Sequence, residues 1–367
     1  MKKNNVTNFF LCLLLTVSVN AFAQLNLPRG SQMATVSQRI GITDVYIKYS
    51  RPSVNNREIW GKVVPYGMNN LGFGTAKESP WRAGANENTI IKFTNDVKIE
   101  GKEIKAGKYS LHIVVNQDDT ATIIFNKNHT AWGSFFYEPS DDVLKVDVKT
   151  NTIPNKEQLT FEFNQVTTNS AVASLSWEKK QFPFKIEVDV ANVVLTDIRK
   201  KLENQPGFNR QTWEQAANFA LNNGGDLDEA LTWINGTISG KFYSQQTFNN
   251  TNIKAGILNK MGKQDEAIAA LDSYLPQATI FEAHQYGRQL IGFGKKDKAL
   301  EVFKLNAKKN KDTWPVHYGL ARGYSAKGDF KNALKHLKKA LANAPNAASK
   351  GRVQANIAKL EKGEDIN

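Results

Sequence analysis

The sequence predicts a two-part fold, an antiparallel β-sandwich or open barrel followed by a short α-solenoid of helical hairpins. Between about Met33 and Val190, apolar residues recur with a period of two, which is typical of strands with one buried face. From about Ala191 the period becomes 3.6, and alanines then recur at intervals of 37, 32 and 34 residues. A period near 34 residues is typical of stacked helix–turn–helix units. We therefore expect a β domain over 24–190 and helical repeats over 208–360.

In the β half, the clearest alternating runs are 45–49, 109–115, 144–148, 159–163, 171–177 and 182–190. Turn residues such as Gly101 and Gly107 separate the runs, so we expect nine or ten short strands. His112 alternates with Leu111 and Ile113 and is expected to face solvent. The alternation fails over 53–88, where we expect a long ordered loop, with or without a short helix.

In the helical half, an apolar stripe predicts a linker helix over 191–207 that ends at Pro206-Gly207. Four hairpins follow, each with a glycine in its turn and an alanine where the paired helices approach most closely. The glycines are Gly225, Gly262, Gly294 and Gly328, and the alanines are Ala230, Ala267, Ala299 and Ala333. The polar tail 361–367 is expected to fray.

The first 23 residues have the features of a secretory signal peptide. Lys2 and Lys3 precede an apolar run, and Ala21-Phe22-Ala23 fits a cleavage signal before Gln24. Because the run is too short to span a bilayer, we expect no transmembrane segment. We expect cleavage after Ala23 and a periplasmic or secreted protein. A retained N-terminal helix is the alternative.

The basic excess of the chain belongs to the helical half. The formal net charge is +13, yet residues 24–190 hold 20 Lys/Arg against 18 Asp/Glu, whereas residues 191–367 hold 26 against 17. A positive surface attracts acidic partners. Because the chain is expected to be exported, we do not expect nucleic acid to be that partner. A solvated lysine face is the alternative. The densest lysines are Lys295, Lys296, Lys298, Lys304, Lys308, Lys309, Lys311, Lys331, Lys335, Lys338 and Lys339.

The last hairpin carries the most specific repeat motif: Leu320-Ala321, Tyr324, Gly328-Asp329, Ala333, Leu337, Ala340 and Pro345. This pattern resembles the tetratricopeptide repeat, and the preceding two hairpins match it moderately. The first hairpin departs, with Asn218 where glycine or alanine is usual, so its register stays open. In such arrays the first helix of each hairpin usually lines the binding groove. The resemblance therefore implies a groove for a protein or peptide partner, lined by Asn218, Asn222, Asn252, Asn259 and Arg322.

The β half contains a second set of ordered motifs. They include Tyr49-Ser50-Arg51-Pro52, Val64-Pro65-Tyr66-Gly67, Trp81-Arg82-Ala83-Gly84-Ala85-Asn86-Glu87 and Ala106-Gly107-Lys108-Tyr109-Ser110-Leu111. These motifs resemble domain-of-unknown-function family 2911 over about residues 25–190. The resemblance implies an exported β domain and brings no reaction with it. Residues 69–80 look like an insertion between two of the motifs.

The loops of the β half hold the best candidates for a ligand site. Three guanidiniums could clamp an anion, tryptophans could stack on a ligand, and Glu87 would be the acid or base. The alternative is structural, with Arg82–Glu87 and Arg57–Glu58 as ion pairs that fix the loop. The candidate residues are Arg51, Arg57, Tyr66, Trp81, Arg82, Asn86, Glu87, Asn126 and Trp132.

Known catalytic patterns are missing from the sequence. The stretch 72–77 lacks the glycine spacing of a phosphate loop, no two histidines have metal-ligand spacing, and Cys12 is the only cysteine. We expect no metal site, cofactor or disulfide. Our hypothesis is an exported binding or scaffold protein whose repeats engage a partner, with the question of enzyme activity left open. The alternative is a small-ligand binder or hydrolase-type enzyme that uses the arginine, glutamate and tryptophan loops.

Overall fold

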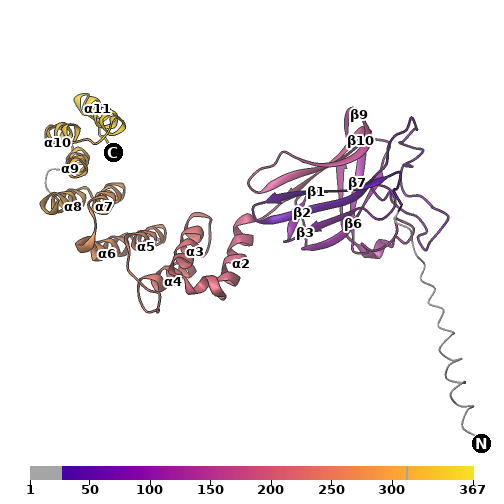
Figure 1. Cartoon of the computed structure of the whole chain (residues 1–367), viewed down its shortest axis with the longest axis horizontal. Helices are drawn as coiled ribbons and strands as arrows, with labels where there is room; N and C mark the ends of the chain where they lie inside the picture. The colour runs from indigo at the N-terminus through magenta and orange to yellow at the C-terminus, as the bar shows by residue number, and fades with distance from the viewer. Residues whose placement is uncertain (1–26, 311–312) are drawn as a thin grey trace, which may run out of the picture. The chain divides into compact units, whose positions relative to one another are not determined.

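The computed structural model describes residues 27–310 and 313–367. The chain divides into two compact units, one ending at Val188 and one spanning Asp189–Asn367. Strands make up the first unit and helices the second (Figure 1), as the sequence predicts. The expected signal peptide lies outside the described residues. None of the described helices is both long and apolar enough to cross a bilayer.

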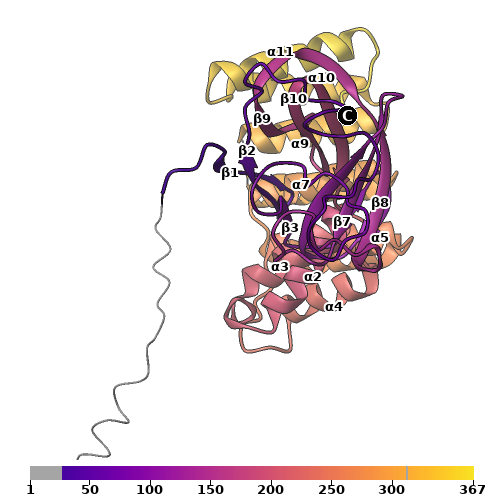
Figure 2. The same ribbon diagram turned by 90° about the vertical axis from the view of Figure 1, so that its right-hand side faces the viewer.

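The first unit is built from two antiparallel sheets. The six-stranded sheet has the order β1-β2-β3-β6-β7-β8 and the four-stranded sheet the order β5-β4-β10-β9. Within the described residues the sheets do not close into a barrel. In Figure 2, β7 and β8 run side by side, as their pairing requires. The strands are β1 Gln32–Ile40, β2 Thr43–Arg51, β3 Ile90–Phe93, β4 Val97–Ile99, β5 Lys102–Ile104, β6 Gly107–Val115, β7 Thr120–Asn126, β8 Asp142–Lys149, β9 Asn151–Asn164 and β10 Ser170–Glu187.

The core of the first unit lies between the two sheets. The hydroxyl of Tyr49, on β2, accepts a hydrogen bond from the backbone N–H of Phe161, on β9, at 3.0 Å. Phe125, on β7, meets Phe184, on β10, edge to face, with ring centroids 5.9 Å apart. These residues are all at least nine-tenths buried. The alternating runs of the sequence therefore supply the inward faces of both sheets.

Strand β10 joins two alternating runs that are out of phase with each other. Leu175 and Trp177 are buried at odd positions, whereas Phe182 and Phe184 are buried at even positions. The pairing of β10 with β9 shifts on both sides of Glu178, which has a φ of 50°. Because an extra residue in a strand reverses which side chains face inward, this irregularity lets one strand bury both runs.

The prediction that His112 faces solvent is wrong. Only 2% of its surface is exposed, and its ring nitrogens lie 3.0 Å from the hydroxyls of Ser110 and Ser134. Strand β6 is buried on both faces, because the segment around Ser134 covers the face that lies away from the second sheet. Burial lowers the pKa of His112 to about 4, so the ring is neutral at pH 7.

The second unit contains the four expected hairpins, α3/α4, α5/α6, α7/α8 and α9/α10. The four predicted close-approach alanines are all 0% exposed. The predicted linker helix packs against the first hairpin through Leu195 and Leu202, so it belongs to this unit. The helices are α2 Val190–Leu202, α3 Arg210–Asn222, α4 Leu227–Ile238, α5 Phe248–Lys260, α6 Gln264–Tyr274, α7 Ile280–Gly292, α8 Lys296–Lys309, α9 Trp314–Ala326, α10 Phe330–Ala342 and α11 Ala347–Glu361.

The turn of the first hairpin has one residue more than the other turns, and this shifts the repeat pattern of α3 by one position. Gly224 has the left-handed φ of 78° that Gly262, Gly294 and Gly328 have in the other turns. Gly225 follows as an additional residue, and a Cβ there would lie 2.7 Å from the Cβ of Ala220. The small residue facing the partner helix is therefore Ala217, which is 0% exposed, and Asn218 lies outside.

Apolar side chains of the helical unit form three clusters that share helices. The first helical core runs from α2 to α5, the second from α5 to α9, and the third from α9 to the C-terminal tail. Helix α5 gives Ile253 to the first core and Leu258 to the second. Helix α9 gives Leu320 to the second core and Tyr318 to the third. Both helices are therefore buried on two sides.

The expectation that the tail 361–367 frays is wrong. Ile366 is only 5% exposed and belongs to the third helical core. Ser325 donates a hydrogen bond to Asp365 at 2.6 Å, and Asn367 donates one to the backbone carbonyl of Arg322 at 3.1 Å. The single apolar residue in a polar heptapeptide is enough to dock the tail on α9, because neighbouring polar groups find partners there.

Candidate functional site

The three candidate arginines do not form one anion clamp. Arg51 donates to the carbonyl of Leu159 at 3.0 Å and to the hydroxyl of Thr160 at 2.9 Å, and so joins β2 to β9. Arg57 donates to the carbonyls of Ser53 and Val54 within its own loop. These two guanidiniums bind backbone carbonyls at separate places, which is a structural role.

Arg82 is partly buried and is held by a backbone carbonyl and an aromatic ring. It donates to the carbonyl of Asn86 at 2.8 Å and stacks on the ring of Phe135 at 5.2 Å. Burial lowers its pKa. Among the described residues, neither expected ion pair forms, because Glu87 pairs with Arg29 and Arg57 binds its own loop. The position of Arg29, 58 residues before Glu87, is the reason that local sequence could not show this partner.

The insertion 69–80 is fastened to the segment around Phe135. Asn69 and Ser79 pair at its base, and the backbone N–H groups of Thr75 and Ala76 both donate to the carbonyl of Phe135 at 3.1 Å. The ring of Phe73 meets that of Phe135, with centroids 5.5 Å apart. The insertion thus fastens to the same segment on which Arg82 stacks. No helix forms over 53–88, a stretch that the structure describes completely.

The aromatic candidates Trp81 and Tyr66 are structural. Trp81 stacks on Trp177 at a centroid distance of 6.0 Å and meets Trp60 edge to face at 5.9 Å. Tyr66 lies against Gly61, where a Cβ would come within 2.9 Å of its ring. Through Trp177, on β10, Trp81 fixes the long loop on the sandwich, whereas Tyr66 packs within the loop itself.

Asn126 and Asn86 also serve the scaffold. Asn126 is 2% exposed and donates to a carboxylate oxygen of Asp142 at 2.9 Å. Tyr137 donates to the other oxygen of that carboxylate at 2.6 Å, and burial together with this bond raises its pKa. Asn86 donates to the carbonyl of Ser31 at 3.1 Å. The φ of Asn86 is 60°, so it occupies a left-handed turn position that asparagine tolerates.

Glu87 and Trp132 lie together around an open cavity, whereas Trp81 and Arg82 line a smaller one of about 100 Å³. The open cavity has a volume of about 290 Å³. Oε1 of Glu87 pairs with Arg29, whose guanidinium lies 5.5 Å from the ring centroid of Trp132. Burial alone would raise the pKa of Glu87, but Arg29 and the nearby Lys48 hold it below its usual value. Glu87 is therefore a carboxylate at neutral pH.

Two side-chain oxygens of residues that line this cavity lack hydrogen-bond partners among the described residues. They are Oε2 of Glu87 and Oδ1 of Asn88, and both atoms are buried. The amide nitrogen of Asn88 is held by the carbonyl of Asn128 at 3.3 Å, so its oxygen has a fixed orientation. Sequence reasoning missed Arg29, Lys48, Asn88 and His129. Only Asn88 carried a local signal, as the neighbour of Glu87.

The predicted groove residues differ in how free they are. Asn218, Asn222 and Asn259 are exposed, on α3 and α5. Asn222 donates to the backbone carbonyl of Asn218 at 2.8 Å and to its side-chain oxygen at 3.0 Å. Asn252 accepts a hydrogen bond from Gln289 of α7. Arg322 donates to the carbonyl of Ile366 at 3.4 Å, so the tail engages it. Because α3 contacts α5 and α7 contacts α9, the first helices share one face of the array (Figure 1). The predicted groove residues that are exposed lie on the first two hairpins.

The dense lysines lie away from this face. Those of the described residues belong to α8 and α10, the second helices of the last two hairpins, except for Lys295 just before α8. Some are already paired, as Lys298 is with Asp272 at 2.7 Å. The groove residues on α3 and α5 are neutral amides. Positive charge and groove are therefore separate features of the array.

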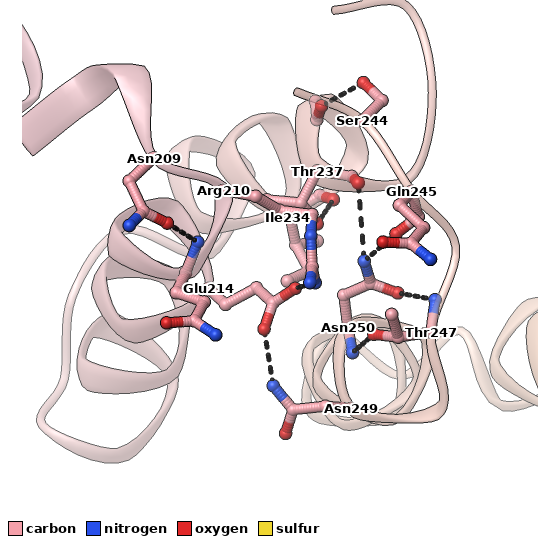
Figure 3. A network of polar contacts seen from close by, with 12 residues as sticks. Asn209, Arg210, Glu214, Ile234, Thr237, Ser244, Gln245, Thr247, Asn249 and Asn250 are labelled. Atoms are coloured by element: carbon pink, nitrogen blue, oxygen red, sulfur yellow. Dashed lines mark hydrogen bonds and ion pairs between the residues drawn. The ribbon is translucent and has the colours of Figure 1, made fainter. Parts of the chain in front are cut away.

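The loop 239–247 between α4 and α5 is held by buried amide and carboxylate contacts, shown in Figure 3. Asn250 is 0% exposed, donates to the carbonyl of Gln245 at 2.8 Å and accepts from the backbone N–H of Thr247 at 2.9 Å. Glu214 accepts from Arg210 and, at 2.7 Å, from Asn249. These bonds tie α3 to the start of α5.

Exposed aromatic side chains meet where this loop lies against the segment just before α3. Phe242 is 79% exposed and Phe208 is 69% exposed, and their ring centroids lie 6.1 Å apart. Tyr243 links them to the hairpin by stacking on Trp213 at 6.3 Å. In contrast to Phe242, the aromatic residues Tyr286 and Phe303 of the later hairpins are buried. The three rings of Phe208, Phe242 and Tyr243 are called the aromatic patch below.

Comparisons with protein families agree with the motifs. Residues 31–186 match the model of DUF2911, a family of proteins of unknown function, and residues 314–347 match a tetratricopeptide repeat model. The resemblances inferred from the sequence are thereby confirmed. The chain matches no protein that has a curated description.

Solved structures similar to this chain include several tetratricopeptide repeat proteins. One from Thermus thermophilus is 18% identical, with 47% of this chain and 91% of that chain covered and a TM-score of 0.33. YrrB, described as having an unusual peptide-binding site, is 17% identical, with 46% and 89% covered and a TM-score of 0.31. One from Cytophaga hutchinsonii is 17% identical, with 47% and 66% covered and a TM-score of 0.35.

Proposed function

We propose that this chain, a DUF2911 domain joined to tetratricopeptide repeats, is an exported binding or scaffold protein whose repeats hold an extended segment of a partner. The observation that carries the proposal is the open face of α3 and α5, where Asn218, Asn222 and Asn259 are exposed. A carboxamide has both donors and an acceptor, so a row of them can bind the backbone of an extended segment without reading its charge.

The aromatic patch is a second observation that favours the first two hairpins as the site of contact with the partner. Large apolar side chains that are mostly exposed and held on a fixed support mark interaction surfaces more often than scattered single residues do. Phe242 is held in this way, because Asn250 anchors its loop. A partner that lies along α3 and α5 would bury this patch as well as the amide row.

The acidic character of the partner is a separate part of the proposal. Lysines gather on α8 and α10, whereas the groove is neutral, so attraction of an acidic surface would act through the second helices. We expect added salt to slow association without abolishing the contact at α3 and α5, because screening weakens exposed charge interactions most.

Site-specific photo-crosslinking tests the proposed groove. A photoreactive amino acid is placed at Asn218 or Asn259 in the full chain, and a matched control carries it at exposed Asp228 on α4, a second helix outside the lysine surface. We expect one crosslinked partner at both groove positions and a weaker product or none at Asp228. Equal crosslinking at all three positions would remove the groove from the proposal.

Export is tested independently of binding. The proposal requires that residues 1–23 are removed, as the charged start, apolar run and Ala21-Phe22-Ala23 indicate. Intact mass measurement of the chain from a periplasmic or culture fraction should give a protein that begins at Gln24. A full-length chain in the cytoplasmic fraction would contradict this part.

A further inference from the structure

One face of the six-stranded sheet is open to solvent along β1, β2 and β3. Val45 and Ile47 of β2 are 0% exposed, because they point towards the second sheet. Successive side chains of a strand alternate between its two faces, so Lys48 points away from the second sheet. Its pairing partner Thr35 on β1 and the residue Lys92 on β3 are also exposed. This outer face is therefore accessible to a large ligand.

Three exposed lysines, here called the lysine trio, gather on the outer face. Lys92 of β3 and Lys108 of β6 are direct partners in the antiparallel pairing, which places their Cβ atoms about 5 Å apart. Lys48 of β2 pairs with Ile90, two residues before Lys92, so Lys48 is the diagonal neighbour of Lys92. Like charges directly opposite each other on neighbouring strands destabilise a sheet. An anion bound between the lysines would remove this repulsion.

The carboxylates nearest to the lysine trio are already paired with arginines. At the outward positions of β1, β2, β3 and β6, Asp44 is the one carboxylate, and Arg39 binds both of its oxygens, at 2.7 and 2.8 Å. Glu87, at the edge of the face near Lys48, is bound by Arg29. Among the described residues no carboxylate forms an ion pair with the trio, so its charge is available to an external anion.

The chemistry of the outer face favours an acidic polysaccharide over a folded protein or a membrane. Lysine is depleted in protein interfaces relative to the rest of the surface, and surfaces that dock on membranes bury apolar side chains. The large apolar residues at the outward positions of β1 and β3 are Met33 and Ile90, and both line the open cavity. The hydroxyls of Thr35 and Ser37 are exposed beside the lysines. A uronic acid residue has a carboxylate for lysine and hydroxyl groups for serine and threonine.

The open cavity of about 290 Å³ continues the outer face, because Lys48 and Ile90 line it. Trp132 also lines it and is 49% exposed, although an indole normally buries most of its area. A pyranose has an apolar C–H face that can pack on an exposed indole. The buried oxygens of Glu87 and Asn88 are out of reach of a ligand and take no part.

We infer that the outer face binds a chain of uronic acid residues, with one sugar ring on Trp132 and carboxylates on Lys48, Lys92 and Lys108. The site is in the β unit, and it does not depend on the partner groove on α3 and α5. It is also separate from the lysines of α8 and α10.

Isothermal titration calorimetry on the full chain tests the inference. The probes are trigalacturonate, the neutral sugar maltotriose, and triglutamate, which carries its carboxylates on a peptide. We expect trigalacturonate to bind, more weakly as salt is added, and maltotriose not to bind. Triglutamate should bind at least about fivefold more weakly than trigalacturonate, because it has no ring to pack on Trp132.

Substitutions then assign the heat of binding to the outer face. Lys92→Gln combined with Lys108→Gln should weaken trigalacturonate binding about tenfold, since each exposed ion pair contributes up to about fivefold. Trp132→Ala should weaken trigalacturonate binding about fivefold and leave triglutamate binding unchanged, and Trp132→Phe should restore part of the loss. Circular dichroism of each variant shows that it is folded.

Two double substitutions are matched controls that remove the same charge elsewhere. Lys62→Gln with Lys98→Gln changes exposed lysines of the same unit that lie off the outer face, and Lys335→Gln with Lys338→Gln changes exposed lysines of α10. Neither should weaken trigalacturonate binding more than about twofold, because exposed charges at a distance are screened.

Four outcomes would overturn the inference. Trigalacturonate could fail to bind, triglutamate could bind as tightly, or a control pair could weaken binding as much as the change at Lys92 and Lys108. The fourth is binding to phosphatidylglycerol vesicles that is lost with the change at Lys92 and Lys108, which would identify a membrane as the occupant. Crosslinking at Asn218 should be unchanged by that substitution, so failure of this site and failure of the partner groove are distinguishable.

Discussion

Two glycines in the insertion 69–80 allow its closure over Phe135 to be tested by matched substitutions. Gly72 and Gly74 both have left-handed backbone, with φ of 67° and 86°. An added Cβ at Gly72 meets nothing within 4 Å, whereas at Gly74 it would lie 2.0 Å from the carbonyl oxygen of Phe135. Alanine at either position costs about 1–2 kcal/mol for the left-handed conformation, but only Gly74→Ala adds a clash with backbone.

The clash should release the insertion from Phe135. Release removes the hydrogen bonds from Thr75 and Ala76, each worth about 1 kcal/mol, and the Phe73–Phe135 ring contact, worth about 0.5–1.5 kcal/mol. Gly74→Ala should therefore weaken closure by about 2–4 kcal/mol, which makes the open form at least about thirtyfold more populated. The two sheets should remain folded, because no strand runs through 69–80.

Limited proteolysis combined with hydrogen exchange measures this release. We expect faster cleavage within 69–80 and loss of protection at the Thr75 and Ala76 amides in Gly74→Ala, with little change in Gly72→Ala. Protection in β6 serves as the internal control for the sandwich. If Gly72→Ala and Gly74→Ala were cleaved at the same rate, the contact with Phe135 would not be what holds the insertion.

Three further substitutions test the corrected features. Ile366→Ala should lower the free energy of unfolding of the helical unit by about 2 kcal/mol, measured by urea denaturation followed by circular dichroism. Substitution of the exposed Glu364 by alanine should leave that free energy unchanged. Equal effects of the two substitutions would mean that the tail is frayed. Because burial lowers the pKa of His112 below its unfolded value, protection of β6 should be complete above pH 6.5 and fall towards pH 4 by up to about 3 kcal/mol. His112→Gln should remove this pH dependence in hydrogen exchange, and a persistent slope would assign it to another group. Ala217→Leu should lower the melting temperature by several degrees and Asn218→Leu should not. The reverse order would mean that Asn218, not Ala217, faces the partner helix.

The periodicities of the sequence were sufficient to predict the fold class, because alternation and the 3.6-residue period each follow from burial of one face. His112 shows where that reasoning stops. Alternation identifies the face turned to the second sheet, but it cannot show that a distant loop around Ser134 covers the other face. Docking of the tail through Ile366 was missed for a similar reason, since a single apolar residue gives no period.

The candidate ligand site was predicted only in part. Glu87 and Trp132 do line one cavity, whereas Arg51, Arg57 and Arg82 are held by carbonyls of the backbone. A guanidinium in a long loop can bind a ligand or satisfy the loop's own carbonyls, and sequence does not distinguish the two. Arg29 could not be assigned from sequence either, because its contact with Glu87 depends on tertiary folding.

The sharing of α5 and α9 between neighbouring cores has a consequence for how the array unfolds. In a one-dimensional stack, cooperativity depends on the interface between adjacent units. If the first helical core unfolds, Ile253 loses its neighbours while Leu258 stays packed in the second core. Helix α5 therefore stays folded unless both cores unfold. Substitution of Ile253 or Tyr318 by a smaller residue should therefore convert one unfolding transition of the array into separate steps. The hairpin that carries the aromatic patch would then unfold while the C-terminal end remains native.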